Sequence, residues 1–427
     1  MADENAALLK IRKIVEDYWK EQKYEFVPGK TKIPLNAPSF GPDEICEAID
    51  SLLKTYVTMG PKVKAFEQAY ASYLGSKYGT MVNSGSTANL MALSVLSNPL
   101  VKDRIKRDDE VIVPAVTWST SVFPIGNIGA MPVLVDIDMH NFGLNVQAVE
   151  DAITEKTRAI MAVHLLGNPC DICALKKVAD EHGLFLIEDT CESTGAKIGG
   201  KFMGSVGDMG SFSFFFSHHI TTMEGGMVVT DNEEYDEMLK PLRAHGWTRE
   251  MRNRDAITAK HADIDSRFLF VNTGYNVRPT DLQGAFGIHQ IKKLDGFIKI
   301  RQENAVYWAK RLSGFRDVLE YQTERPNTRH VWFGFPITVK PGAPFTRKEL
   351  TNWLESKCIE TRPVMGGNLA EQPAFKFIEH KVSGDLKNAK HVMRDSFFFG
   401  NHQNVGPAER EWVAKCITDF VSARVKK

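Results

Sequence analysis

Short apolar runs that alternate with helical segments constrain the fold of this 427-residue chain more than any other feature. Seven runs have the length and composition of strands, and segments with helical periodicity lie between most of them. The runs are residues 80–82, 110–113, 131–136, 159–164, 185–188, 211–215 and 227–230. This alternation predicts an α/β domain built around a mainly parallel sheet, in which ligands collect at the carboxyl ends of the strands.

The chain is expected to have three parts. The sequence predicts a helical extension over residues 1–30, a large domain over 31–300 and a smaller C-terminal α+β domain over 301–427. In the extension, apolar residues recur at helical spacing from Leu8 to Trp19. In the smaller domain, a strand-like run is followed by two segments with helical patterns.

Two longer stretches, residues 45–74 and 281–312, keep a helical pattern and are each expected to form long helices. A strand is expected over residues 330–339 in the last third of the chain. Residues 250–270 are polar and irregular, so the sequence supports no assignment there.

Composition and charge exclude several classes of protein. Lysine plus arginine equals aspartate plus glutamate, 53 against 53, so no overall basic field favours nucleic acid. The Cys170-x-x-Cys173 pair has no second pair at zinc-site spacing, and we expect no metal site. The chain begins without the basic residues and apolar run of a signal peptide, and no stretch has the roughly 18 apolar residues of a membrane span. We expect a cytoplasmic protein that binds no membrane.

Candidate ligand-binding residues follow several of the predicted strands. Gly85, Ser86 and Thr87 open a helical segment, where free amides and hydroxyl groups can bind phosphate, although Ser and Thr are also ordinary N-caps. Trp118 lies just past a strand and can stack on a flat ligand or simply pack. Asp189 ends an apolar strand, so it can pair with a protonated pyridine nitrogen or cap a helix.

The order of these motifs resembles that of the DegT-type sugar aminotransferases, fold-type I enzymes that use pyridoxal 5'-phosphate. The motifs are Gly-Ser-Thr, Trp, Glu-Asp-x-x-Glu, Ser-Phe-x-x-x-His-His, Glu-Gly-Gly and Gly-Tyr-Asn-Val-Arg-Pro, and the resemblance covers about residues 32–425. It implies a homodimer with its active site at the interface. It also implies a cofactor site made by Gly85, Ser86, Thr87, Trp118, Asp189, Glu192, Ser213 and, across the interface, Asn276.

The informative departure from the family is His218, which stands where the aminotransferases have the lysine that bonds to the cofactor, five residues after Ser213. Imidazole cannot form that bond, so we expect pyridoxal or pyridoxamine 5'-phosphate to be held non-covalently, with His218 as the catalytic base. The histidine resembles the branch of 3-dehydratases that act on nucleotide-linked 4-keto-6-deoxy hexoses.

The resemblance to this branch implies a reaction and a substrate. It implies removal of the C3 hydroxyl of GDP-4-keto-6-deoxymannose, with glutamate as amino donor and ammonia released. Substrate contacts are expected from Thr58, Met59, Gly60, His219 and Arg249.

Two alternatives remain. CDP-4-keto-6-deoxyglucose-type 3-dehydrases also carry the histidine, but they hold an iron–sulfur cluster with four cysteines. Here only Cys358 and Cys416 follow the histidine, so we expect no iron–sulfur cluster, although GDP or CDP and hexose or heptose stay open. The alternative from another class is an inactive relative that binds or senses nucleotide sugars. The retained Asp189 and Ser213 argue against it.

Overall fold

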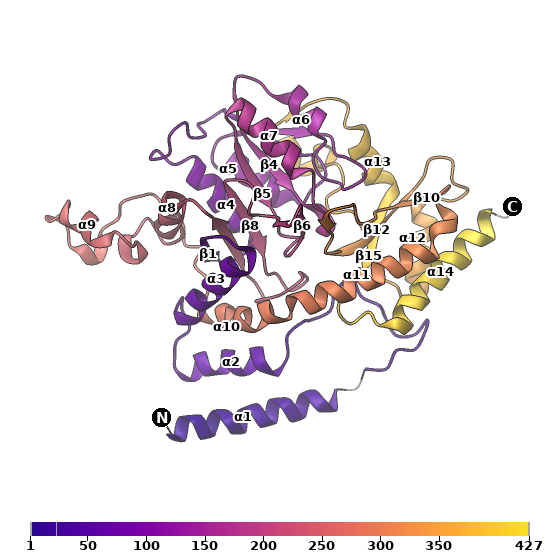
Figure 1. The fold of residues 1–427 in the computed structure, drawn as a ribbon, viewed down its shortest axis with the longest axis horizontal. Helices are drawn as coiled ribbons and strands as arrows, with labels where there is room; N and C mark the ends of the chain where they lie inside the picture. Colours follow the sequence, from indigo (N-terminus) through magenta and orange to yellow (C-terminus); the bar gives the residue numbers. More distant parts are fainter. Residues whose placement is uncertain (1, 23, 426–427) are drawn as a thin grey trace.

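A computed structural model describes residues 2–22 and 24–425, and a single large sheet dominates it (Figure 1). The sheet has eight strands in the order β1-β9-β8-β5-β4-β2-β3-β14. Their bounds are β1 Tyr78–Val82, β2 Glu110–Pro114, β3 Met131–Val135, β4 Thr157–Val163, β5 Phe185–Asp189, β8 Met209–Ser213, β9 Gly226–Thr230 and β14 Lys381–Val382. All seven predicted strands are present.

Strand direction confirms the predicted fold class. Strands β14, β3, β2, β4, β5 and β8 pair in parallel. Only β9 among the described strands of this sheet runs the other way, because it pairs antiparallel with both β8 and β1. The result is a mainly parallel α/β sheet in which the carboxyl ends of five central strands meet at one edge.

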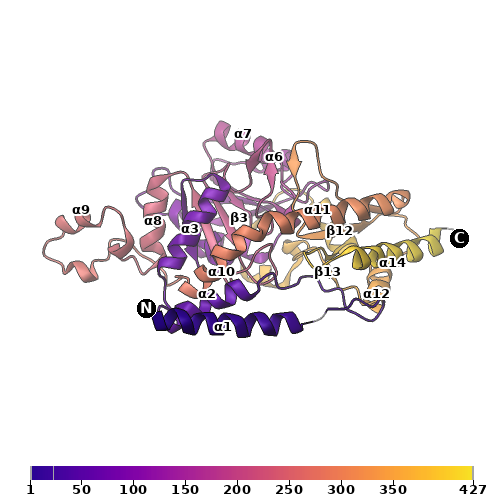
Figure 2. The same cartoon turned by 60° about the horizontal axis from the view of Figure 1, so that its bottom comes forward.

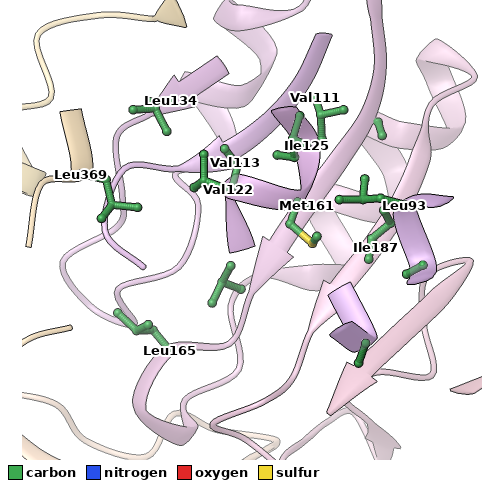
Figure 3. Close-up of a cluster of buried hydrophobic side chains, with 14 of the residues drawn as sticks. Leu93, Val111, Val113, Val122, Ile125, Leu134, Met161, Leu165, Ile187 and Leu369 are labelled. Carbon is green, nitrogen blue, oxygen red and sulfur yellow. The ribbon is translucent and has the colours of Figure 1, made fainter. Parts of the chain in front are cut away.

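The alternation of side chains along each strand explains why both faces of the sheet are covered. In β2, Val111 and Val113 belong to one buried apolar cluster and Ile112 belongs to another. Figure 3 shows the first cluster, where Leu93 of helix α4 (Gly85–Leu96) packs with Met161 of β4. Strands that are apolar on both faces are typical of a sheet that is covered by helices on both sides.

Both stretches predicted to be helical do form helices, but each is interrupted. Residues 45–74 divide into α2 (Pro42–Leu53) and α3 (Pro61–Leu74), because the chain turns before the Gly60 N-cap and Pro61 starts a new helix. Residues 281–312 divide into α10 (Asp281–Gln290) and α11 (Leu294–Arg311), separated by the turn η5 (Ile291–Lys293).

The predicted N-terminal helix is present as α1 (Ala2–Glu21), which lies beside α2 in both views (Figures 1 and 2). Arg12 on α1 forms an ion pair of 2.9 Å with Asp43 on α2. Within the described residues, no helix combines the length and apolar character needed to cross a membrane. The predicted parts also include residues 1, 23 and 426–427, which lie outside the described residues.

The last third of the chain forms a second sheet with the antiparallel order β10-β12-β15-β13. Its strands are β10 Leu319–Tyr321, β12 Gly334–Val339, β13 Thr361–Pro363 and β15 Ser396–Gly400, and helices α11, α12 (Arg347–Ser356) and α14 (Pro407–Val425) accompany them. The strand predicted over residues 330–339 begins only at Gly334, because residues 330–333 pair with the loop after β4 instead. The three-part division of the chain remains a prediction.

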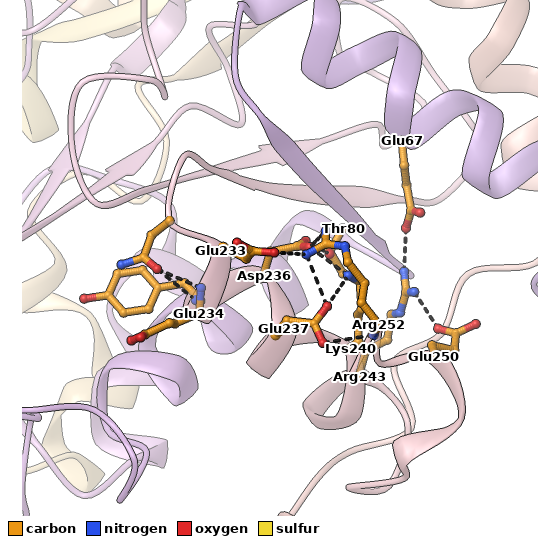
Figure 4. A network of polar contacts seen from close by, with 12 residues as sticks. Glu67, Thr80, Glu233, Glu234, Asp236, Glu237, Lys240, Arg243, Glu250 and Arg252 are labelled. Atoms are coloured by element: carbon orange, nitrogen blue, oxygen red, sulfur yellow. Dashed lines mark hydrogen bonds and ion pairs between the residues drawn. The ribbon is translucent and has the colours of Figure 1, made fainter. Parts of the chain in front are cut away.

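The segment without a sequence assignment contains η3 (Thr248–Glu250), α9 (Arg254–Ala259) and η4 (Ser266–Phe268), and it projects from one end of the molecule (Figure 1). Its base is held by Arg243, the last residue of α8 (Glu233–Arg243). The Arg243 guanidinium binds Glu67 at 2.6 Å and Glu250 at 2.8 Å, as Figure 4 shows. The arginine is 4% exposed, so the two ion pairs are shielded from solvent.

We expect Arg243→Met to lower the free energy of unfolding by about 3–5 kcal/mol, because it leaves two carboxylates without their buried partner. The matched control is Arg267→Met, whose ion pair with Asp265 lies on the surface and should contribute below about 1 kcal/mol. Urea unfolding of the two variants measures both changes. Equal losses would show that Arg243 does not anchor this segment.

Candidate active site

A cavity of about 430 Å³ lies at the carboxyl ends of the parallel strands. It brings together seven predicted residues from four separate segments: Gly85, Ser86, Trp118, Asp189, Glu192, Ser213 and His218. The second sheet (β10, β12, β13 and β15) and the loops next to its strands, here called the second sheet region, contribute one wall through Phe333, Met365 and Phe398. Residues far apart in the sequence therefore converge because parallel strands present all their carboxyl ends at one edge.

The beginning of helix α4 forms one side of the cavity. Ser84 is its N-cap, and the Thr87 amide donates a hydrogen bond of 3.2 Å to the Ser84 hydroxyl. In return the Ser84 amide donates to the Thr87 hydroxyl at 3.1 Å, so Thr87 serves the cap and does not line the cavity. The first-turn amides of Gly85 and Ser86 have no acceptor within the helix, which makes this end suited to an anion.

Gly85 is required by the close approach of α4 to strand β8. A Cβ added at Gly85 would lie 2.4 Å from the Cβ of Ser213, far inside normal contact distance. The glycine therefore lets the helix N-terminus and the end of β8 form a continuous cradle. The Ser213 hydroxyl also accepts a hydrogen bond from the Phe215 amide, which starts the loop after β8.

Asp189 is fixed at the end of β5 by three hydrogen bonds. Asn89 Nδ2 and the Ser121 hydroxyl donate to Asp189 Oδ2 at 2.7 and 2.8 Å, and the Cys191 amide donates to Oδ1 at 3.1 Å. Ser211 in turn donates to Asn89 at 2.5 Å. The network joins α4, β5 and β8, and it presents an immobile carboxylate to the cavity.

The neighbouring carboxylate, Glu188, lies on the other side of β5 and is fully buried. Three amides in residues 204–207 donate to it at 2.7–2.8 Å. His164 Nδ1 accepts from the Cys170 amide, so the imidazole is neutral and its Nε2–H donates to Glu188 at 3.0 Å. These bonds secure the strand that carries Asp189.

His218 lies in the loop between β8 and β9, and its ring lines the cavity. The ring packs edge-on against Phe333, with 5.3 Å between ring centroids, and its Nδ1 is buried without a hydrogen-bond partner. Burial, and then the charge of Arg301, lowers the pKa of His218 to about 3. The imidazole is therefore neutral at working pH and able to accept a proton. No lysine lines the described walls of this cavity.

Glu192 lies near Asp189 in the cavity wall and accepts a hydrogen bond of 2.8 Å from the Leu166 amide. Burial raises the pKa of Glu192 to about 8, and the charge of Asp189 adds to this effect against the opposing Leu166 bond. At neutral pH Glu192 is thus mainly protonated. It can donate a hydrogen bond, which a carboxylate cannot.

Several predicted residues do not line this chain's cavity. Asn276 is exposed and accepts a hydrogen bond of 3.0 Å from Arg278 Nε. His219 is fully buried, and its Nε2 donates to the Val331 carbonyl at 2.9 Å, which gives it a packing role. The remaining predicted substrate contacts are Thr58, Met59, Gly60 and Arg249, and they too lie outside the cavity lining. Their substrate roles stay predictions that the geometry of one chain does not support.

Two residues that hold Asp189 in place, Asn89 and Ser121, were not predicted from the sequence. Most of the apolar wall of the cavity was not predicted either. Asn89 lies four residues after Gly85, hence on the same face of α4, and this spacing could have indicated it. Ser121 follows Trp118 by three residues in the same turn. The phenylalanines of the second sheet region carry no such signal, because only the tertiary fold brings them to the cavity.

The family prediction is confirmed by comparison with known proteins. Residues 39–418 match the DegT/DnrJ/EryC1/StrS aminotransferase family, and the chain belongs to that family.

Among curated relatives, the GDP-4-keto-6-deoxy-D-mannose 3-dehydratase of Yersinia pseudotuberculosis is 43% identical over 379 residues, which cover 87% of this chain and 95% of the relative. The dTDP-4-dehydro-2,6-dideoxy-D-glucose 3-dehydratase of Saccharopolyspora spinosa is 34% identical over 422 residues, 96% of this chain and 91% of that protein. The predicted likeness to 3-dehydratases is thus confirmed.

Solved structures agree with this relationship. A GDP-4-keto-6-deoxymannose-3-dehydratase mutant with bound GDP-perosamine has a TM-score of 0.85 and 38% sequence identity, covering 90% of this chain and 100% of its own. A second structure of that enzyme, with a trapped PLP-glutamate geminal diamine, has a TM-score of 0.85 and 37% identity over the same shares of the two chains.

We expect the cofactor-free Glu192→Gln variant to be more stable than the wild type at pH 8, by about 4 kcal/mol. The pKa of Glu192 is raised from 4.5 to about 8 in the folded chain, so wild-type stability from this group falls as pH rises between those values. Glutamine does not ionise, and the two proteins should match at pH 4.5. Urea unfolding at both pH values tests this, with exposed Glu181→Gln as control; a pH-independent difference would contradict it.

Proposed function

We propose that the chain is a pyridoxal-phosphate-dependent 3-dehydratase, which removes the C3 hydroxyl of GDP-4-keto-6-deoxymannose with glutamate as amino donor. The observation that carries this proposal is His218, a neutral imidazole with an unpartnered nitrogen, standing in the cavity at the family's lysine position. The identity of 43% to a protein of that activity supports it.

The residues of the cavity fit this cofactor. The first-turn amides of α4 with Ser86 and Ser213 suit its phosphate, and the fixed carboxylate of Asp189 suits a protonated ring nitrogen. The Trp118 side chain is 57% exposed at the mouth of the cavity, as a residue that stacks on a flat ring would be. When bound as pyridoxamine phosphate, the cofactor supplies an amine for the sugar ketone and a ring that accepts electrons.

In this proposal His218 moves the proton that the reaction requires, taking it from the carbon next to the cofactor ring. The low pKa of His218 in the cofactor-free cavity leaves the imidazole unprotonated, the form that is able to take up a proton. Protonated Glu192 would be able to donate a hydrogen bond to an oxygen of the bound cofactor. No lysine lines the described cavity, so the chain offers no amine to displace a bound product, and hydrolysis would have to release it with loss of ammonia.

The substrate is tested by incubating the protein with pyridoxal phosphate, glutamate and a panel of GDP-, CDP- and dTDP-linked 4-keto sugars. We expect ammonia release and loss of one oxygen from GDP-4-keto-6-deoxymannose, measured by enzymatic ammonia assay and mass spectrometry. A faster reaction of another nucleotide sugar would correct the substrate. If no sugar reacts while nucleotide sugars bind, the chain is a non-catalytic relative.

His218→Asn is expected to lower turnover by about a hundredfold to ten-thousandfold, the usual contribution of a positioned base. Cofactor affinity measured by equilibrium dialysis should change little, because asparagine leaves the α4 cradle and Asp189 intact. The matched control is His182→Asn, at the exposed end of helix α7 (Ile172–His182). Near-normal turnover of His218→Asn would exclude this histidine as the base.

We further propose that the active protein is a homodimer in which Asn276 completes the cavity of the partner subunit. Its exposure, and its absence from the cavity of its own chain, support this arrangement.

Mixing Asn276→Ala with His218→Asn provides the test of the dimer. If each active site draws these residues from different chains, half of the randomly mixed dimers carry one intact site, and about a quarter of wild-type activity should return. The separate variants should stay weakly active. No recovery after confirmed subunit exchange would place both residues in the same site or exclude the shared arrangement.

A further inference from the structure

We propose that the protein has a second ligand site, separate from the catalytic cavity, which binds a small phosphorylated sugar. The site is a cavity of about 300 Å³ between the second sheet and the turn after β3. Met139, His140 and Phe142 of that turn form one wall, and strands β10 and β12 form the other. This volume suits a ligand larger than inorganic phosphate.

The pleat of the second sheet explains why this cavity has a polar floor. Register pairs Glu320 with Thr338, so their side chains share one face of the β10–β12 ladder. The next pair along the ladder, Tyr321 and Ile337, alternates to the opposite face and belongs to the apolar core of this region, with Tyr321 also reaching the edge of the cavity. One face of the ladder is thus packed, whereas the other meets the cavity with groups that hydrogen-bond.

Positive charge gathers around this polar floor. Three cations line the cavity, Arg316, Arg325 and Lys340, against one carboxylate, Glu320. Within the described residues, none of these four side chains forms an ion pair. The lining therefore carries an excess of two positive charges in a chain of zero net charge, which favours an anion.

The guanidinium groups are already oriented. Arg316 lies over the Tyr321 ring, 3.5 Å from its centroid, and donates to the Tyr321 carbonyl at 2.9 Å. Arg325 donates from Nη2 to the Pro169 carbonyl, while its Nε is buried without a partner. Arginines held in place lose little conformational freedom on binding phosphate, which they match through paired N–H groups.

A buried amide provides an independent indication of a ligand. Gln322 is 5% exposed and lines the cavity, and its Nε2 has no hydrogen-bond partner. Its orientation is settled by His330, whose Nδ1 accepts from the Trp332 amide. His330 Nε2 must then carry the hydrogen and donate to Gln322 Oε1 at 3.2 Å, which leaves the Gln322 NH₂ group free. An unsatisfied buried donor is costly unless a ligand accepts from it.

The two kinds of group indicate the ligand class. Arg316, Arg325 and Lys340 suit a phosphate, whereas Glu320 and Gln322 suit the hydroxyls of a sugar. The aromatic rings nearby are already buried, Phe142 at 2% and Tyr321 at 5% exposed, so no open ring face is offered to a nucleotide base. A phosphorylated sugar without a base fits these groups best.

Isothermal titration of the whole protein with glucose 6-phosphate, glucose and inorganic phosphate tests the proposal. We expect saturable binding of glucose 6-phosphate, weaker binding of phosphate and none of glucose. Lys340→Glu should weaken glucose 6-phosphate at least about tenfold, because it reverses one of the three charges. The matched control is Lys348→Glu on exposed α12, which should stay within about twofold.

If the Lys340→Glu variant does not fold, Lys340→Met replaces it in the experiment. This variant should also weaken binding of glucose 6-phosphate. No saturable binding of glucose 6-phosphate would overturn the proposal. Binding that neither Lys340 variant changes would place the ligand in the catalytic cavity and would overturn it equally. The measurement needs no turnover, so its outcome does not depend on the proposed dehydratase activity.

Discussion

The site depends on the hydrogen-bond network that joins helix α4 to the ends of β5 and β8. Asn89 connects Asp189 on one strand with Ser211 on the next, and Gly85 lets the helix approach close enough for these bonds to form. A buried network of this kind is favourable only when all its members are satisfied. The same contacts that stabilise the sheet edge therefore also position the carboxylate and the first-turn amides of α4.

The positions of the strands were predictable because the pattern that specifies them is local. Strands buried on both faces leave short continuous apolar runs, and all seven were found. The interruptions within the two helical stretches were not predicted, because helical periodicity does not reveal a turn. Residues on both sides of Gly60 remain in helical phase, and the interruption at Ile291–Lys293 is too short to disturb the pattern. The strand that begins at Gly334 is shorter than predicted because residues 330–333 pair with a loop distant in sequence, which a local pattern does not reveal.

The candidate site divides in the same way. Residues at strand ends, such as Asp189 and Ser213, and His218 in the loop after β8, could be predicted since the carboxyl ends of parallel strands meet at one edge. The wall made by Phe333 and Phe398 could not, because it depends on how the second sheet region packs against the first. The protonation state of Glu192 could not be predicted from the sequence either, because burial by neighbours distant in sequence raises its pKa.

The reversed direction of β9 has a consequence for how enzymes of this architecture change their chemistry. Antiparallel neighbours can be joined by a simple loop, so residues 214–225 return directly beside the strand they leave, and backbone bonds between Phe214 and Gly225 and between Phe214 and Thr222 close the loop at its base. The residue at the tip is thereby insulated from the sheet. A side chain in this loop can therefore be exchanged while β8 and β9 keep their pairing, so under the proposed function a change from amine to imidazole would alter the chemistry without altering the sheet.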